Sequence, residues 1–589
     1  MNDHKNDLQI ISKLMFRLLL IQILLAMTGA VNGFVSSFFA ANYVGIEAMS
    51  AVGLYSPISM FLGAIAALIS GGCAVICGKY LGQNEKGKLQ NVFSLDLIIS
   101  SAVSLVFTAG IVILSRSEHL MNFFTANEEL HKNFSRYLLG QALGVYPLIL
   151  SSQLPTFLSM ENKSRRSLLA SVIYIIVNLI LNFLFVQVMN MQELGLSFAS
   201  SLGMWVLFAV ELQYFLSGKS ERRLTFKDLS FSDAGSIVRV GFPGAASNIY
   251  QTIRGLIVNH VLEVYTGSIG LSAFATANNV MNIFWSIPAG MMAVSRLLIS
   301  VSTGEEDRQT LVNIMKVMMR RFIPLMIAVD ACIIASAPVL ASLFFRESEA
   351  LLRTAECLRI LPLCMPFSIL LMHFTCLGQS MNRSVFLNIT SLLDGVLCVA
   401  GFSILLVPLI GVSGACIANV ANGVVTTIFI IAYAWFKNRK MPRNMEDLMA
   451  LPQDFGVAEN ERIDISVTRM EEVIRVSQKV QDFCLSKGID RKRAYLAGLA
   501  MEEMAGNIVD HGFTKDNKKH SIDIRVVHKD GDIILRIKDD CVPFDPKDRN
   551  RITDGDDPAK NIGIRMIYGI MNDINYENLL GLNVLTIRI

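Results

Sequence analysis

Three side chains near the C-terminal end have the types and spacing to hold a metal ion beside phosphates. Glu503, Asn507 and His511 follow one another at intervals of four residues in the stretch LAMEEMAGNIVDHGF. Residues four apart project from the same face of a helix. The Glu503 carboxylate and the Asn507 amide could therefore hold a water molecule and a Mg²⁺ ion next to a nucleotide. The alternatives are a solvated helix face for Glu503 and a structural helix-end role for His511.

The elements that must position these side chains form a small α/β segment, residues 461–589. Alternating apolar and polar residues predict strands, and periodic apolar residues predict helices. The predicted strands cover residues 461–468, 521–528, 533–538 and 583–589, and the predicted helices cover residues 470–487, 490–511 and 563–572. This order predicts an α/β sandwich in which helices cover one face of a single sheet.

Further motifs follow the helix at fixed places in this segment. They are Asp539-Asp540-Cys541-Val542-Pro543-Phe544-Asp545-Pro546, Asn561-Ile562-Gly563-Ile564-Arg565 and Asn583-Val584-Leu585-Thr586. In order and spacing they resemble the boxes of the GHKL ATPases, closest to the anti-sigma-factor serine kinase branch. The resemblance implies that the segment binds ATP and Mg²⁺.

The same resemblance implies a role for individual residues. Asp539 would accept the adenine amino group, Asn507 would bind Mg²⁺, and Glu503 would be the general base. Backbone N–H groups at a helix start bind phosphates well, which is the implied role of the Gly563 motif. The implied cofactor-binding set also includes Asp545 and Thr586.

The sequence as a whole is too apolar for a soluble protein of 589 residues. The whole sequence is 52% hydrophobic and 17% charged, with a mean hydropathy of +0.48. The stretch Gly45–Leu89 aligns without a gap on Gly267–Leu311, and each copy is an apolar run that ends in a charged loop starting with glycine. A long apolar repeat of this kind indicates a duplicated membrane domain.

The twenty-residue rule for membrane helices predicts about twelve spans in two sets of six. The first set is 14–41, 48–77, 92–114, 137–158, 168–188 and 195–216, and the second is 237–265, 271–301, 322–345, 357–377, 386–407 and 414–435. We therefore predict an all-α polytopic membrane protein with a C-terminal α/β domain. The predicted domains are an N-terminal half (1–218), a C-terminal half (219–439), a linker (440–460) and the GHKL-like domain (461–589).

Lysine and arginine are concentrated in alternate loops of this arrangement. The loops 190–194, 266–270 and 408–412 carry no basic residue, whereas the loops on the other side are basic. By the positive-inside rule, both termini are predicted to be cytoplasmic in a multi-pass protein of the inner membrane, in contact with lipid. The net charge of +3 is spread over short loops, which argues against a nucleic-acid partner.

Three motifs carry a resemblance over about Leu14 to Phe436. VGIEAMSAVGLYSP, GKYLGQNEKGKL and GFPGAASNIYQT are similar to sequences of the MATE family of multidrug and toxin extruders. The resemblance implies secondary active efflux of small organic, often cationic, compounds, driven by Na⁺ or H⁺. Many members carry an aspartate in the first span where this chain has Ser36, with Asn32 one turn earlier, so we place both on the predicted ion pathway.

Polar residues inside predicted spans are further candidates for a substrate or ion pathway, because they are costly in a membrane. Asp330 and Asp394 are the clearest carboxylates, and Arg254 and Asn278 are additional polar groups. A carboxylate facing a cleft could exchange a proton or Na⁺ for a cationic substrate. The alternatives are an interhelical hydrogen bond or an Asp–Arg pair inside the bundle.

One motif imitates a phosphate-binding loop. Residues 82–88, GQNEKGK, fit the pattern GxxxxGK, but Leu89 stands where a P-loop has Ser or Thr, and no predicted strand precedes the motif. We therefore expect no ATP at this loop.

Three functions remain open from the sequence. The first is an efflux antiporter whose C-terminal domain senses nucleotide or binds a regulatory protein of the anti-sigma-antagonist type. The second is a membrane-tethered serine kinase or anti-sigma-like signalling protein. The third is a lipid-linked sugar flippase of the same superfamily, which would need a large basic cavity, whereas Arg254 is almost the only base in the middle of a predicted span.

Overall fold

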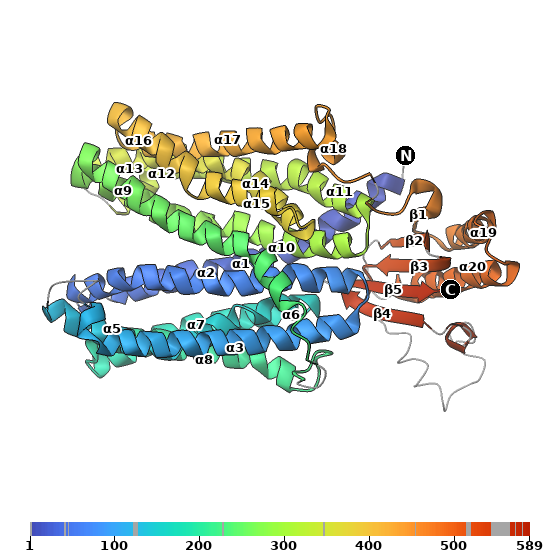
Figure 1. The fold of residues 1–589 in the computed structure, drawn as a ribbon, viewed down its shortest axis with the longest axis horizontal. Helices are drawn as coiled ribbons and strands as arrows, with labels where there is room; N and C mark the ends of the chain where they lie inside the picture. Colours follow the sequence, from blue (N-terminus) through green and yellow to red (C-terminus); the bar gives the residue numbers. More distant parts are fainter. Residues whose placement is uncertain are drawn as a thin grey trace.

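The computed structural model consists of a long helical part and a small sheet domain at one end (Figure 1). It describes residues 3–39, 43–44, 46–121, 128–225, 229–344, 348–453, 455–513, 520–529, 531–543, 566–569, 571, 573–579 and 581–589. The helical part divides into two layers, one built from α1–α8 and the other from α9–α17 (Figure 1). We call these layers the N-half and the C-half.

The N-half is built from six long helices and several short ones. The long helices are α1 (Asp3–Phe39), α2 (Ile46–Gly82), α3 (Lys86–Arg116), α5 (Glu128–Ser151), α7 (Ser164–Asn182) and α8 (Gln192–Leu216). The short ones are α4 (Glu118–Met121), α6 (Leu154–Met160) and a π-helical turn at Phe183–Val188.

The C-half is built in the same manner. Its helices are α9 (Ala234–Phe284), α10 (Ser286–Gly304), α11 (Arg308–Val317), α12 (Ile323–Ser342), α13 (Ser348–Ile360), α14 (Met365–Ser380), α15 (Ser384–Leu392), α16 (Cys398–Ile410) and α17 (Val412–Asn438). Helix α9 breaks at Gly267, whose φ of 65° is a conformation that glycine adopts without strain. The break falls in the predicted loop 266–270.

Among the described residues, ten helical segments are long and apolar enough to cross a membrane. The predicted spans 137–158 and 237–265 lie on α5 with α6 and on the first part of α9, and neither is among these ten segments. The number of twelve spans therefore stays a prediction.

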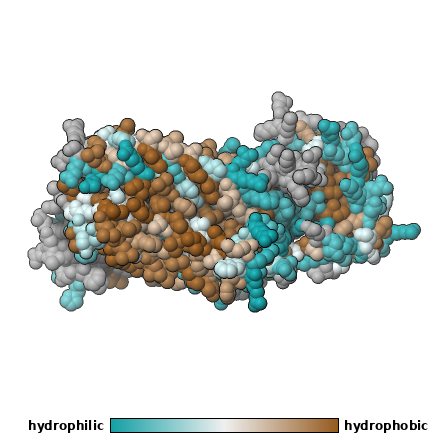
Figure 2. Space-filling model, turned by 90° about the horizontal axis from the view of Figure 1, so that it is seen from above, coloured by the Kyte–Doolittle hydropathy of each residue, from teal (hydrophilic) through white to brown (hydrophobic). Residues whose placement is uncertain are grey.

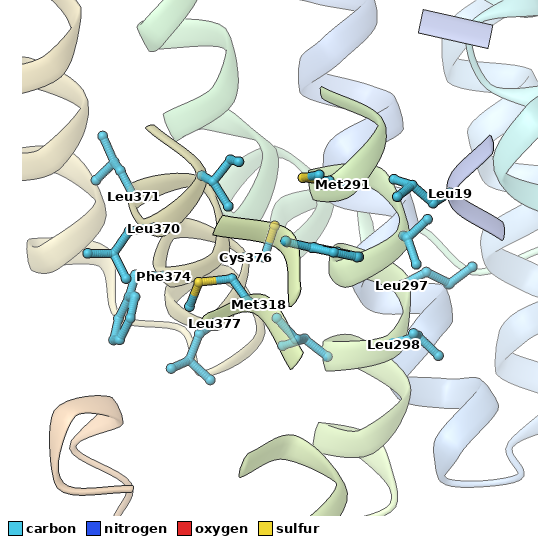
Figure 3. Close-up of a cluster of buried hydrophobic side chains, with 14 of the residues drawn as sticks. Leu19, Met291, Leu297, Leu298, Met318, Leu370, Leu371, Phe374, Cys376 and Leu377 are labelled. Carbon is cyan, nitrogen blue, oxygen red and sulfur yellow. The ribbon is translucent and has the colours of Figure 1, made fainter. Parts of the chain in front are cut away.

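Apolar side chains occupy both the interior and the flank of the helical part. Figure 2 shows apolar side chains over its flank and a largely hydrophilic surface at the sheet domain. Leu105 and Val106 on α3 are examples of this exposed surface. Inside, Leu19, Met291 and Phe374 belong to a buried cluster that joins α1, α10 and α14 (Figure 3). An apolar flank around a packed interior is what a lipid environment requires.

The two halves pack tightly at the end next to the sheet domain, which we call the domain-bearing end. A Cβ atom at Gly82 would clash with the backbone of Val301, and one at Gly304 would clash with the backbone of Lys79. Because glycine is required for this approach, the ends of α2 and α10 touch main chain to main chain. The domain-bearing end is therefore closed.

The C-terminal domain is a five-stranded antiparallel sheet of order β1-β2-β3-β5-β4. Its elements are β1 (Arg462–Val467), α19 (Met470–Ser486), α20 (Arg491–Asn507), β2 (Ile522–Lys529), β3 (Asp532–Asp539), β4 (Asp573–Leu579) and β5 (Leu582–Arg588). One face packs its apolar residues against α19 and α20, as predicted, and the other face meets the membrane part. The sequence did not predict β4. Of the predicted helix 563–572, residues 566–569 are helical, and residues 563–565, 570 and 572 lie outside the described residues.

The predicted linker 440–460 is fastened to the C-half. It contains the short helix α18 (Met445–Met449). Two arginines of the C-half, Arg308 and Arg383, donate to its main chain at 2.7–3.0 Å. The accepting oxygens belong to Met449, Ala450, Pro452 and Phe455.

Candidate functional site

A polar cavity of about 370 Å³ lies within the C-half. It brings together three of the predicted pathway residues, Arg254 and Asn278 of α9 and Asp394 of the π-helical turn Leu393–Leu397. Other polar lining residues are Gln251, Asn282, Ser368, Asn419 and Asn422. The cavity therefore offers amide, guanidinium and carboxylate groups to one occupant.

Asp394 keeps its carboxylate available in this cavity. The Asn422 amide donates to Asp394 Oδ1 at 2.8 Å. Arg254 Nη1 donates instead to the main-chain oxygen of Asp394, at 3.3 Å. In the described structure the guanidinium thus contacts the Asp394 main chain rather than the side chain, which argues against the Asp–Arg pair considered from the sequence.

Asp330 on α12 is buried without compensation. Its exposed fraction is 3%, and neither carboxylate oxygen has a hydrogen-bond partner among the described residues. An ionised carboxylate is expensive to bury without a partner. A proton or a metal cation would supply the missing partner, which makes Asp330 a candidate coupling residue.

The first-span candidates Asn32 and Ser36 lie on α1. Their side chains fall outside the described part, so their roles remain predictions.

Two buried carboxylates of the N-half were missed by the sequence analysis. Asp96 on α3 is 0% exposed and accepts from Cys73 Sγ at 3.3 Å, and Glu211 on α8 is 1% exposed. Both lie within predicted spans, so the signal that selected Asp330 and Asp394 could also have found them.

The predicted nucleotide residues Glu503 and Asn507 lie on α20, as expected. The side chain of Asp490 caps this helix by accepting from the backbone N–H groups of Lys492 and Arg493 at 2.9 and 3.0 Å. Asn507 Nδ2 donates to the Glu503 carbonyl oxygen one turn earlier, at 2.6 Å. His511 follows in an exposed π-helical turn that ends α20.

Asp539, the predicted adenine acceptor, ends β3 and is 5% exposed. Its Oδ1 accepts from the Cys541 backbone N–H at 2.9 Å and from Asn583 Nδ2 at 2.7 Å. Burial raises the pKa of Asp539 above its ordinary value, and these two hydrogen bonds oppose that rise. A Cβ atom at Gly512 would contact Cys541 Sγ at 3.2 Å, so the turn after α20 adjoins the turn after Asp539.

Thr586 lies on the face of the sheet away from the α19 and α20 side. Successive residues of a strand point to opposite faces, and Thr586 lies opposite Arg536 in the sheet register, where its Oγ1 accepts from Arg536 Nε at 3.4 Å. Arg536 faces the membrane part, so Thr586 does too. Asn583, which stands opposite Asp539, occupies the place predicted for Thr586.

Two other predicted nucleotide residues, Asp545 and Gly563, lie outside the described residues. The false P-loop is a helix–turn–helix connection, because α2 runs to Gly82 and α3 begins at Lys86. Its glycine packs on the C-half, in agreement with the expectation that this loop is not a phosphate site.

The fold and these sites define a helical membrane protein in two halves with an attached ATPase-like domain. The chain belongs to the MatE family, whose model matches it twice, at residues 23–184 and 243–405, together more than half of the chain. Residues 467–589 match the histidine kinase-like ATPase domain. The resemblances to the MATE family and to the GHKL ATPases are confirmed, whereas the anti-sigma-factor branch stays a prediction, and the double match agrees with the internal repeat.

Relatives of the membrane part are known by sequence and by structure. A probable multidrug resistance protein NorM from Streptococcus pneumoniae is 19% identical over 300 residues, which is 49% of this chain and 62% of that protein. The multidrug resistance protein NorM of Vibrio cholerae is 21% identical over 287 residues, which is 47% of this chain and 61% of that protein. The aligned part thus spans less than two-thirds of these curated relatives.

Among solved structures, a MATE protein in complex with MaL6 is similar in fold. Its TM-score is 0.68 at 21% sequence identity, and the match covers 75% of this chain and 98% of that chain.

Proposed function

We propose that the protein is a secondary active efflux transporter, an antiporter that exchanges Na⁺ or H⁺ for small organic, often cationic, compounds across the cytoplasmic membrane. Its MatE family membership and the multidrug resistance names of its relatives support this class. We propose further that the domain-bearing end faces the cytoplasm, as the loop charges predict.

The observation that carries the proposal is the uncompensated carboxylate of Asp330, together with the polar cavity at Asp394. A transporter of this type needs a group whose charge is balanced by the coupling ion in one state and released in another. The buried Asp330 carboxylate, with no hydrogen-bond partner among the described residues, is suited to that role, and Asp394 presents a second carboxylate to a cavity large enough for an organic cation.

The C-terminal domain is proposed to bind ATP with Mg²⁺ and to regulate transport. The match to the ATPase-like family and the buried, hydrogen-bonded Asp539 support nucleotide binding. A single small domain without a P-loop is poorly suited to drive transport by hydrolysis, which favours a sensing role. Asn507 would hold the Mg²⁺ ion and Glu503 would face the phosphates.

Transport in energised membrane vesicles tests this proposal. Efflux of ethidium, an organic cation, should follow an imposed Na⁺ or H⁺ gradient and should be lost in Asp330→Asn and Asp394→Asn. Glu349→Gln, at an exposed carboxylate of α13, is the matched control and should transport normally. Efflux that ignores both gradients and requires ATP hydrolysis would overturn the proposal.

A further inference from the structure

The C-terminal sheet rests on both halves of the membrane part at once. Its membrane-facing side carries Arg525, Arg536 and Lys538, which reach residues 305–307 of the C-half. Its edge strand β4 reaches the N-half, in the turn at residues 84–86 and at Asn162. In alternating access the halves must separate at each end in turn. A domain that bridges both halves therefore influences how easily this end opens.

The contact with the C-half is built from buried ion pairs. Arg525 Nη1 lies 2.5 Å from Asp307 Oδ1, and Lys538 Nζ lies 2.7 Å from Glu305 Oε2. The Asp307 and Glu305 side chains are 7% and 3% exposed. Burial alone would raise the pKa of Asp307, but Arg525, Lys538 and hydrogen bonds from Thr310 hold it well below its usual range. Together with the fastened linker, these pairs fix the domain to the C-half.

The polar contacts of β4 with the N-half are weaker in kind. Asn162 Nδ2 donates to Asn578 Oδ1 at 2.9 Å, and Asn575 donates to Asn84. β4 also forms an ion pair from Glu577, whose side chain is 10% exposed, to Lys86, whose side chain is 54% exposed. Neutral hydrogen bonds contribute little to stability, and breaking an ion pair whose cation is open to solvent costs less than breaking a buried one. The N-half is therefore the side that the domain can release.

The β4 contact is linked to the nucleotide site by a chain of amides. Asn162 donates to Asn578, Asn578 Nδ2 donates to Asn583 Oδ1 at 2.8 Å, and Asn583 Nδ2 donates to Asp539 Oδ1 at 2.7 Å. We call Asn162, Asn578 and Asn583 the asparagine relay. All its bonds run in the same direction, toward the carboxylate, so each bond polarises the next.

The turn after Asp539 also lies close to the N-half. A cavity of about 330 Å³ between the domain and the N-half is lined by Pro543, Asn578 and Asn162. A change in the backbone of this turn would therefore alter the contact between β4 and the N-half.

From these contacts we infer that nucleotide occupancy controls how tightly the domain binds the N-half, through the asparagine relay. The inference rests on the proposed binding of adenine at Asp539. An adenine amino group that donates to Asp539 keeps the carboxylate ionised and accepting. This holds Asn583 in its observed orientation and, through Asn578, keeps the bond to Asn162.

Nucleotide thus favours the state in which the domain-bearing end is closed, and its loss frees the N-half while the C-half contact persists. Coupling between two sites is reciprocal, so docking of the N-half must also raise nucleotide affinity. Asn162, in the membrane part, is on this account a positioning residue for the nucleotide site.

Calorimetric titration of Mg²⁺–ATP into the full chain in lipid nanodiscs tests the relay. Asn162→Ala and Asn578→Ala each remove one neutral hydrogen bond of the chain, and we expect the Kd for ATP to rise about 3–10-fold. Asn84→Ala and Asn575→Ala remove the neighbouring contact between the same strand and the same half, outside the relay. These matched controls should change the Kd by less than about 2-fold, since they leave Asn583 untouched.

The outcomes separate the relay from nucleotide binding itself. Wild-type affinity in both relay variants would overturn the relay and leave nucleotide binding standing. An equal loss in relay and control variants would also overturn it, because general docking would then account for the effect. No binding of Mg²⁺–ATP to the wild-type chain would overturn the proposed nucleotide function and the relay together. Thermal unfolding identifies a misfolded variant, and Asn162→Ala leaves the C-terminal domain unaltered.

Discussion

The two copies of the repeated loop have the same backbone turn but different side chains. Asn84 in the first copy and Glu306 in the second stand at the same repeat position, and both adopt positive φ, 60° and 53°. The first copy reads GQNEKGK and the second GEEDRQT. Duplication therefore preserved the turn while the charge diverged.

The divergence decides how each half meets the C-terminal domain. The acidic second copy receives Arg525, Arg536 and Lys538 in a buried contact, whereas the first copy offers Asn84 and an exposed Lys86. A buried ion pair is strongly destabilised when one partner is removed, and an exposed pair contributes little. One loop is thus a permanent anchor and the other a releasable contact.

The largest effect is expected from breaking the anchor. Arg525→Ala removes the closest cation from the buried Asp307 carboxylate and leaves it Lys538 and the Thr310 hydrogen bonds, so the contact with the C-half should weaken by up to about 3–5 kcal/mol. The linker should then become sensitive to limited proteolysis. Because a neutral amide can still cap α11 by accepting from the Thr310 N–H and leaves no buried charge, the double variant Arg525→Met with Asp307→Asn should regain much of the protection. If the linker of the Arg525→Ala variant stayed fully protected from proteolysis, the ion pair would not be the anchor of the domain.

A smaller effect is expected at the glycines that close the domain-bearing end. Gly304→Ala forces the backbones of α2 and α10 apart, at about 1–3 kcal/mol for an overpacked contact. The matched control is Gly87→Ala, at a glycine of the first loop copy where an added Cβ atom would meet no atom within 4 Å. Labelling of Gln83→Cys by a membrane-impermeant maleimide should be faster in the Gly304 variant than in the control background. Equal rates would show that this closure does not depend on the glycine contact.

The two contacts should also respond differently to pH. The pKa of Asp307 is depressed in the docked state, so its stabilising contribution is complete above the ordinary pKa of about 3.9 and is lost only as the pH falls through the depressed value. Burial raises the pKa of Asp539, and the proposed adenine amino group would donate to the ionised form. Lowering the pH from 8 toward 5 should therefore weaken ATP binding in calorimetry before it affects linker protection. The reverse order would contradict these assignments.

The smallest effect is expected at the pair Lys86–Glu577, whose lysine side chain is 54% exposed and whose glutamate side chain is 10% exposed. Lys86→Ala should change the stability of the N-half contact by at most about 1 kcal/mol. The effect should disappear at high salt, which screens exposed charges, whereas the effect of Arg525→Ala should persist. A double-mutant cycle with Glu577→Ala, followed by proteolysis at two salt concentrations, measures the coupling energy of the pair and its dependence on salt. A large, salt-independent coupling energy would remove the distinction between the two loops.

Much of the architecture followed from local patterns. The apolar repeat predicted the two halves, and the 3.6-residue periodicity placed Glu503 and Asn507 on one helix. The strand β4 escaped prediction because Asn575, Glu577 and Asn578 are polar, and they are polar because their partner is a polar loop distant in the sequence. Local periodicity carries no information about such a partner.

The arrangement of residues around Asp539 could not be read from local patterns for the same reason. Asp539 and Asn583 lie opposite each other only because β3 and β5 pair in one register, and a shift of one residue would exchange the faces. The sequence order made Thr586 a candidate, whereas the register placed Asn583 beside Asp539. The anchor likewise depends on charges more than two hundred residues apart, which meet only in the folded chain.

Electron paramagnetic resonance distances from the domain to each half test the central claim most directly. In a Cys332→Ser background, one label at Lys479→Cys on the exposed face of α19 pairs either with Gly87→Cys in the N-half or with Arg443→Cys beside the C-half. The account predicts a narrow Lys479–Gly87 distance distribution with Mg²⁺–ATP, a longer and broader one without nucleotide, and no change for Lys479–Arg443. Equal changes at both pairs, or a Gly87 distance that ignores nucleotide, would contradict it.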